Sequence, residues 1–421
     1  MPLHKSSTFA DIITALSYTL DLDENRKLYH AWRVAILTYE TSALLPGLPA
    51  KEQLFYAALL HDIGAIGYSD YVIHSPSVWP EYSVPFLSGH STRGAAILGS
   101  IPRLEAAAEM VLDHHEWWNG AGYPNGKRGP EISPGGMLIR LADTVETIIQ
   151  EIPTLTKSQL CFILEERIDQ EYPKAYFEAI IAALSQNSLF ENLHNYVWLP
   201  QRIQEIRTEL TDETEQGETR IREVQAAIRV FAQIIDTKHQ YTAGHSERVA
   251  MYAYYLGKAC GLDEQKLQNL RIASLLHDAG KIAIPRWILD KPNKLTVYEF
   301  KQIRLHPLYS QQIIALISGF EQIAVVAGQH HEWLSGQGYP HGTKGNEIPF
   351  LARFVAVADA FDAIITNRSY QKARSVSTAL RELAREAGTH FDPEVVRVAQ
   401  QTFQTDLPRL ANFSPLPSNV F

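Results

Sequence analysis

The chain has 421 residues, of which 45% are hydrophobic and 20% are charged, a composition typical of a globular protein. This length is too great for one ordinary hydrophobic core, so two or three domains are expected. The 38 basic and 47 acidic residues give a formal net charge of −9, which argues against a general binder of nucleic acid or acidic membranes.

The N-terminal stretch MPLHKSSTFADIITALSYTLDLDEN lacks the apolar core of a signal peptide, and no segment approaches the ~18 apolar residues of a membrane helix. Cys161 and Cys260 are the only cysteines, and neither lies near a chemical motif. Two reduced thiols are therefore expected rather than a disulfide or a nucleophile. Together these features predict a cytoplasmic protein.

The first predicted element is a helix near the N-terminus. In FADIITALSYTL, which begins at Phe9, apolar residues recur at spacings of three and four, which predicts a helix with one apolar face. Runs of alternating Val, Ile and Thr between turns are nearly absent along the whole sequence, so few strands are expected. The predicted fold class is all-α.

Short polar motifs follow the first helix. They are HAWRVA from His30, LLHD ending at Asp62, HHEWWNGAGYP from His114 and RLAD ending at Asp143, with His90 between the second and the third. Further along, TDETEQGETR begins at Thr211 without apolar periodicity, which indicates a loop or the exposed start of the next helix. EVQAAIRVFAQIID then returns to helical periodicity.

The second half repeats these motifs in the same order. LLHD recurs at Asp278, HHEWLSGQGYP at His330 and AVAD at Asp359, each 216 residues after its counterpart, and HSERVA begins 215 residues after His30. Such a constant offset indicates an internal duplication, running from about residue 9 to 184 and from about 224 to 403. We therefore predict two tandem helical bundles, with domains at 1–205 and 206–421.

The repeated residues are those that bind transition metals. A lone histidine on a helix is usually a satisfied core or surface residue, but ten of the 16 histidines fall at aligned positions, together with four aspartates. The predicted C-terminal ligands are His245, His277, Asp278, His306, His330, His331 and Asp359. The predicted N-terminal ligands are His30, His61, Asp62, His90, His114, His115 and Asp143.

Five imidazoles and two carboxylates are too many for one tetrahedral ion but suit two ions that share a carboxylate bridge. Neighbours on a regular helix point about 100° apart. The His-Asp dipeptide must therefore sit where a helix starts or ends, or reach separate ions. The ligand types do not select among iron, manganese, nickel and zinc.

In the second copy the series HSERVA, HDAGK, HPLYS, HHEWLSGQGYPHGTKGNEIP, VADAFDA, NRSYQKA and GTHFDPEVV resembles the HD-GYP branch of the HD superfamily of metal-dependent phosphohydrolases. The resemblance implies a helical bundle that hydrolyses cyclic di-GMP to pGpG and often to GMP by a two-metal mechanism. It also implies that Asp278 bridges the two ions and that a diguanylate cyclase (GGDEF protein) is a possible docking partner.

The resemblance also implies substrate contacts. Lys281, in HDAGK, would neutralise phosphate oxygens as a catalytic group together with Asp278. Arg368 and Lys372 resemble the family's basic phosphate grip, although Gln371 stands where another basic residue is common. Tyr339 would contact substrate from a loop shaped by Gly336, Gly338, Pro340 and Gly342. Tyr241 and Arg26 precede the first histidine of each copy where a carboxylate would hold a third ion, so two ions per centre are expected.

The N-terminal copy keeps the ligand set but not the phosphate-binding residues. Ala65 stands in place of Lys281, and Ile152 in place of Arg368. We expect this copy to be metal-competent, with a possible second pair of ions, but weakly active or inactive. Its predicted role is regulatory or structural, as one subunit of a dimer packs on another. Hydrolysis or sensing of a related nucleotide is the alternative.

Three other functions remain open. The enzyme could prefer 3′,3′-cyclic GMP-AMP, since base-reading contacts cannot be located from one sequence. It could be a non-hydrolytic module that binds cyclic dinucleotides, although Lys281 and the complete ligand set argue against that. A dimetal oxygenase on the same scaffold is the third, and the GYP loop and basic tail argue against it. A homodimer is also possible.

Overall fold

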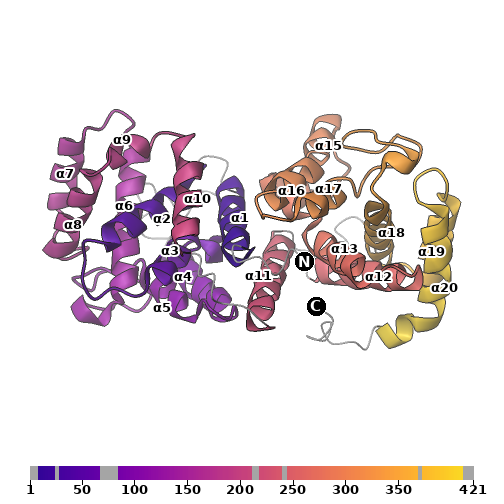
Figure 1. Ribbon diagram of the computed structural model, residues 1–421, viewed down its shortest axis with the longest axis horizontal. Helices are drawn as coiled ribbons and strands as arrows, with labels where there is room; N and C mark the ends of the chain where they lie inside the picture. The colour runs from indigo at the N-terminus through magenta and orange to yellow at the C-terminus, as the bar shows by residue number, and fades with distance from the viewer. Residues whose placement is uncertain are drawn as a thin grey trace. The chain divides into compact units, whose positions relative to one another are not determined.

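The computed structural model describes residues 8–23, 28–66, 84–210, 218–238, 244–367 and 372–410, and these residues are almost entirely helical (Figure 1). No β-strand forms in these ranges, and the two isolated bridges join Ile168 to Tyr172 and Ala387 to Phe391. The all-α prediction is therefore confirmed. No helix in the described ranges is long and apolar enough to cross a membrane.

The helices of the first half and the segment that follows it run in this order: α1 (Thr8–Asp23), α2 (His30–Ser42), α3 (Lys51–Leu59), η2 (Ile63–Ala65), α4 (Val84–Gly99), α5 (Glu105–Asp113), η3 (Gly129–Glu131), α6 (Pro134–Glu151), α7 (Lys157–Glu165), α8 (Lys174–Leu184), α9 (Leu189–Asn192), α10 (Trp198–Leu210) and α11 (Glu218–Thr237).

The second half contains α12 (His245–Ala259), α13 (Glu264–Leu276), η4 (Ala279–Ala283), α14 (Arg286–Leu289), α15 (Val297–Ile303), α16 (His306–Ile314), α17 (Glu321–Gly328), η5 (Gly345–Glu347), α18 (Phe350–Ile365), α19 (Val376–Arg385) and α20 (Pro393–Leu410). Elements α2, α3, η2, α4, α5, η3, α6, α7 and α8 thus recur in order as α12, α13, η4, α16, α17, η5, α18, α19 and α20. The predicted duplication is confirmed at the level of whole elements.

Two compact units form, one from Leu16–Ala226 and the other from Met1–Ala15 with Ala227–Phe421. Helices α1 and α11 are therefore each divided between the units. The domain boundary at 205/206 stays a prediction, because compactness alone does not measure independent folding.

The core of the second unit is built around α18. Its sequence FLARFVAVADAFDAII is apolar on most sides, which is typical of a helix surrounded by others. It packs against α12, α13, α17, α19 and α20. Phe354, Val355, Val357 and Phe361 are fully buried. Asp359 is thereby carried on a rigid central helix.

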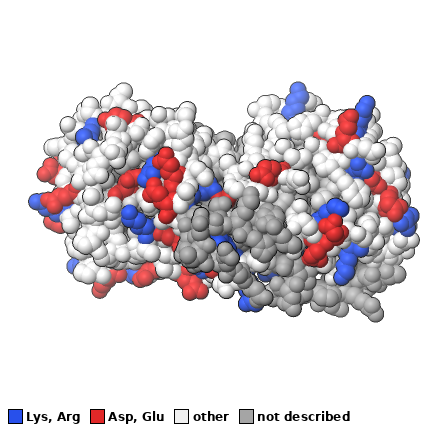
Figure 2. Space-filling view, viewed as in Figure 1, with Lys and Arg blue, Asp and Glu red and all other residues white. Residues whose placement is uncertain are grey.

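The surface agrees with the acidic composition. Figure 2 shows basic and acidic side chains intermingled on the visible face, with no continuous basic area among the residues coloured there. Cys161 and Cys260 are half-buried and unbridged.

Candidate metal centres

The His-Asp dipeptide of the second copy lies at a break between two helices. Helix α13 ends at Leu276, His277 is its C-terminal cap, and Asp278 precedes the 3₁₀ helix η4. His61 and Asp62 occupy the same break between α3 and η2. The predicted position at a helix end is confirmed, and the change of direction lets neighbouring side chains face one site.

A glycine in each copy lets the third histidine of the ligand set lie against this break. A Cβ on Gly280 would lie 2.0 Å from the backbone oxygen of His306 and 2.5 Å from the backbone nitrogen of Ser310. Only a residue without a side chain fits there, so η4 contacts the first turn of α16 directly. The Ser310 hydroxyl accepts from Gly280 N at 2.8 Å and donates to the His277 oxygen at 2.6 Å.

Asp278 lies between two groups of histidines. Its Oδ2 is 3.6 Å from His245 Nε2 and 3.4 Å from His277 Nε2. Its Oδ1 is 3.3 Å from His306 Nε2 and 4.0 Å from His330 Nε2. Each carboxylate oxygen therefore faces a different pair of imidazoles, which is the arrangement of a carboxylate that bridges two ions.

The structure brings all seven predicted C-terminal ligands together. Ligand atoms within 4.8 Å of one another form three overlapping groups: His245, His277 and Asp359; His277, Asp278 and His330; and His306, His330 and His331.

Hydrogen bonds fix the orientation of these imidazoles. Nδ1 of His277, His306 and His330 lies 2.7, 2.7 and 2.5 Å from the backbone oxygen three residues earlier. A carbonyl oxygen only accepts, so each Nδ1 carries the proton and each Nε2 presents a lone pair. Nε2 of His306 and of His330 are 3.4 Å apart. Two Nε2 atoms this close, each on a ring whose Nδ1 is held by a carbonyl, are an arrangement that suits a metal ion.

Buried polar atoms agree with this interpretation. His245 Nε2, His277 Nε2 and Asp278 Oδ1 are buried and make no hydrogen bond. Such atoms are costly to bury unless a ligand satisfies them. The residues present therefore fit divalent ions.

Ionisation also favours metal binding. Burial tends to raise the pKa of Asp278, but His277 and Lys281 outweigh it and hold that pKa well below its usual range. Burial and the neighbours His277 and His306 lower the pKa of His330 to about 3. Burial alone would lower the pKa of His245, yet three surrounding carboxylates raise it well above its usual value. The surroundings of Asp278 and His330 therefore favour the forms that bind metal, whereas the carboxylates around His245 favour its protonated form.

A supporting carboxylate behind the first histidine escaped the sequence analysis. Asp362 Oδ2 accepts from His245 Nδ1 at 2.8 Å, and its Oδ1 accepts from Arg248 Nε at 2.7 Å. The first copy repeats this with Glu146, which lies 2.6 Å from His30 Nδ1 and 2.8 Å from Arg33 Nε. Both carboxylates follow the last metal-site aspartate by three residues, a signal that the aligned copies contained.

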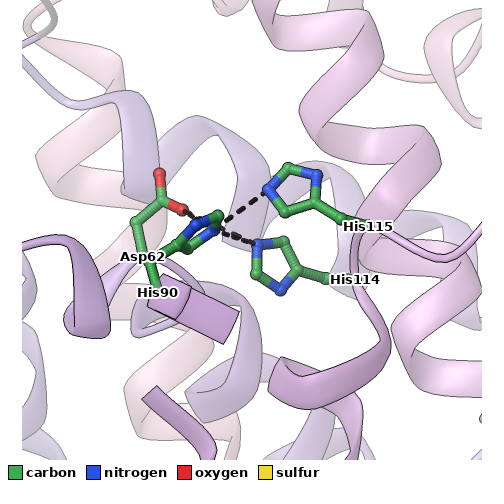
Figure 3. Close-up of side chains that lie close together, drawn as sticks. All are labelled: Asp62, His90, His114 and His115. Atoms are coloured by element: carbon green, nitrogen blue, oxygen red, sulfur yellow. Dashed lines mark hydrogen bonds and ion pairs between the residues drawn. The ribbon is translucent and has the colours of Figure 1, made fainter. Parts of the chain in front are cut away.

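The N-terminal centre has the same geometry. Asp62 Oδ2 is 3.7 Å from His30 Nε2 and 3.3 Å from His61 Nε2. Its Oδ1 is 3.5 Å from His90 Nε2 and 3.6 Å from His114 Nε2. Figure 3 shows Asp62, His90, His114 and His115 converging on one point. His30, His61 and Asp143 form the adjoining group. All seven predicted N-terminal ligands therefore meet.

The predicted substrate contacts have mixed outcomes. Lys281 forms an ion pair with Asp278 Oδ2, beside the centre, while its N-terminal counterpart Ala65 is buried. The ring of Tyr339 lies 4.8 Å from that of His331, and burial raises the pKa of its hydroxyl. Lys372 is exposed, and Arg368 lies outside the described residues. The substrate-binding roles of all four stay predictions.

The loop after His330 and His331 requires glycine for two reasons: positive φ angles at some positions and a close backbone approach at another. Gly336 and Gly342 adopt φ of +79° and +70°, which favour glycine. A Cβ on Gly338 would lie 2.3 Å from the backbone nitrogen of Trp333. The prediction that this loop is shaped by its glycines is confirmed.

The sequence profile of the HD domain family matches residues 17–168 and 229–395, once in each copy and over more than half of the chain. The crystal structure of V-cGAP3, a cyclic GMP-AMP specific phosphodiesterase of Vibrio cholerae, has a TM-score of 0.67 at 24% identity. It covers 94% of this chain and 98% of that chain. This likeness establishes the fold.

Curated relatives are phosphodiesterases. The 3′3′-cGAMP-specific phosphodiesterase 3 of Vibrio cholerae is 32% identical over 325 residues, or 75% of this chain and 66% of that protein. The 3′3′-cGAMP-specific phosphodiesterase 1 of the same organism is 27% identical over 90% of this chain and 89% of its own length. A cyclic di-GMP phosphodiesterase response regulator of Xanthomonas campestris is 38% identical over 39% of this chain and 44% of its own length.

Proposed function

Since the chain belongs to the HD domain family, we propose that it is a metal-dependent phosphodiesterase that hydrolyses cyclic dinucleotides at its C-terminal centre. The observation that carries this proposal is the bridging position of Asp278, whose two oxygens face separate pairs of histidines. When bound, divalent ions would activate water and stabilise the leaving oxygen of a phosphodiester.

The proposed substrate is 3′,3′-cyclic GMP-AMP rather than cyclic di-GMP. The motifs alone favour cyclic di-GMP first and the mixed dinucleotide second. The relatives favour the second, because the two proteins that match most of this chain are named for 3′3′-cGAMP, whereas the cyclic di-GMP enzyme matches 39% of it.

The chain's own residues would then divide the work. His245, His277 and Asp359 would hold one ion, and His306, His330 and His331 the other, with Asp278 between them. Lys281 now pairs with Asp278. From this position beside the centre, the ammonium group would be able to reach a non-bridging phosphate oxygen, where it would stabilise charge in the transition state.

We propose that the N-terminal centre also holds divalent ions but contributes little turnover. Its ligands match those of the C-terminal centre in arrangement, yet Ala65 provides no cation. The metal identity, the docking of diguanylate cyclases and a homodimer stay predictions.

Purified full-length protein tests the proposal. Metal-free protein is loaded separately with Fe²⁺, Mn²⁺, Ni²⁺ and Zn²⁺, mixed with 3′,3′-cyclic GMP-AMP, cyclic di-GMP or cyclic di-AMP, and its products are separated by anion-exchange chromatography. We expect linear dinucleotide with at least one metal, fastest from the mixed substrate. Binding without hydrolysis under all four metals would instead support a signalling module, and oxygen uptake without ester cleavage an oxygenase.

A further inference from the structure

An arginine lies beside the C-terminal centre without a carboxylate partner. Arg304 caps the C-terminus of α15, two residues before His306. Among the described residues its side chain makes a single hydrogen bond, a long one from Nη2 to the Gly338 oxygen at 3.5 Å. Within the described residues, Arg248, Arg286 and Arg353 each pair with an aspartate at 2.7–3.0 Å. Arg304 forms no ion pair there, so most of its N–H donors are available to a ligand.

Aromatic rings hold this guanidinium in place. Its Cζ lies 4.9 Å from the ring centre of Tyr339 and 5.9 Å from that of Phe300. The two rings are 6.5 Å apart, and Phe300 is 47% exposed. An exposed ring and an oriented, half-buried cation thus stand side by side.

This group is continuous with one half of the metal centre. The Tyr339 ring is 4.8 Å from the ring of His331 and 6.5 Å from that of His306. A phosphodiester at the centre carries a ribose and a base on each side, so one base would extend several ångströms outward. The surface formed by Phe300, Arg304 and Tyr339 adjoins the group of His306, His330 and His331, where such a base would lie.

We propose that Phe300, Arg304 and Tyr339 form a guanine-reading platform, a proposal that rests on the cyclic dinucleotide activity inferred above. The exposed Phe300 ring offers a stacking face for a base. Arginine donates to two adjacent acceptors on guanine, O6 and N7, whereas adenine presents an amino group where guanine has O6. A guanine is therefore accepted on the platform, and an adenine is not.

The N-terminal copy lacks two of the three platform residues. At the 216-residue offset, Phe300 corresponds to Val84 and Arg304 to Ser88, while Tyr123 matches Tyr339. The copy that has alanine in place of Lys281 thus also has valine and serine in place of Phe300 and Arg304. The platform belongs to the centre that is equipped for phosphate chemistry.

Two substitutions of Arg304 separate base reading from charge. Arg304→Ala should lower kcat/KM for 3′,3′-cyclic GMP-AMP by about tenfold or more, the scale of an arginine–guanine contact, mainly through KM. Arg304→Lys keeps the charge but loses the paired donors, so it should lose nearly as much. Arg397→Ala, which removes an exposed arginine paired with Glu394 on α20, is the matched control. Thermal melting verifies that each variant is folded.

A substrate analogue whose guanine is replaced by 7-deazaguanine tests the proposed hydrogen bond from Arg304 to guanine N7, because it lacks that acceptor. It should be a poorer substrate than 3′,3′-cyclic GMP-AMP for the wild type but not for Arg304→Ala. Equal penalties in both proteins, or full activity of Arg304→Lys, would overturn the platform and indicate an arginine that binds phosphate. Absence of turnover by the wild type would instead refute the proposed function.

Discussion

The two copies within this chain hold the same ligands but differ in what surrounds them. In each, an aspartate lies between two pairs of histidines at 3.3–4.0 Å, and a carboxylate three residues beyond the last aspartate orients the first histidine. Around the second centre stand Lys281 and Arg304. Around the first, Ala65 and Ser88 occupy the aligned positions.

The first copy has a different cation near its centre, and that cation is neutralised. Arg140, one turn before Asp143, donates to Glu171 Oε2 at 2.6 Å. In the second copy Ala356 stands at the aligned position, and His390 stacks on Trp333 at 4.2 Å where Glu171 would be expected. The two copies therefore keep the same candidate metal ligands while the charged residues around them differ.

Removing the bridging carboxylate from one copy at a time should give the largest effect. Asp278→Asn leaves the two histidine pairs without a bridge, so turnover should fall on the order of a thousandfold or more. Asp62→Asn should leave most of it. Metal analysis of both proteins shows whether each variant empties its own centre. Equal loss of activity from the two variants would mean that the copies catalyse together.

The lysine contrast can be tested in both directions. Lys281→Ala should lower kcat about a hundredfold, because an ammonium group aimed at a phosphate oxygen is lost. In the Asp278→Asn background, Ala65→Lys should recover little turnover, since the first copy also lacks Arg304 and Phe300. Steady-state kinetics with 3′,3′-cyclic GMP-AMP measures both. Recovery close to the wild-type rate would show that this lysine alone accounts for the difference in activity between the two centres.

The carboxylate that accepts a hydrogen bond from the first histidine should contribute equally to metal affinity in both copies. Asp362→Asn and Glu146→Gln each weaken the hydrogen bond that orients a ligand, so metal affinity at that centre should fall about 10–100-fold. Competition with a chelator, followed by metal analysis, measures this change. Glu394→Gln, an exposed carboxylate on α20, serves as control. A drop confined to one copy would show that the two centres are not equivalent as metal sites.

The smallest effect concerns packing. A Cβ on Gly64 would lie 2.0 Å from the His90 oxygen and 2.5 Å from Gly94 N, so Gly64→Ala should destabilise the first unit by about 1–3 kcal/mol. Gly99→Ala, with no atom within 4 Å of the added Cβ, should be neutral or slightly stabilising. Urea unfolding compares the two. Similar midpoints would show that η2 and α4 can move apart without cost.

Much of the fold, and which side chains converge at the two candidate metal centres, could be predicted because the chain contains its own alignment. Repetition distinguished these histidines from the others, and the 216-residue offset predicted the order of the elements. The carboxylates that orient the first histidine of each copy were harder to predict. His245 and Asp362 are 117 residues apart, and only the folded chain brings them together. The backbone oxygens that orient His277, His306 and His330 could not be read from sequence, because every residue carries one.

Arg304 illustrates a different limit. Its neighbours in sequence indicate only a polar residue near a helix end, and its importance arises from a missing partner. Whether an arginine is neutralised depends on carboxylates contributed by other elements, as Glu171 neutralises Arg140 in the first copy. Sequence gives the charge of a side chain but not how much of it remains available.

The first two turns of α1 belong to the compact unit that also contains the C-terminal half of the chain. Phe9, Ile12 and Ile13 are buried, and Asp11 Oδ2 accepts from Ser318 N at 2.9 Å within the unit that extends to the C-terminus. A fragment beginning at residue 206 would lack those side chains and the hydrogen bond from Ser318 to Asp11, so it would not contain the whole of this compact unit.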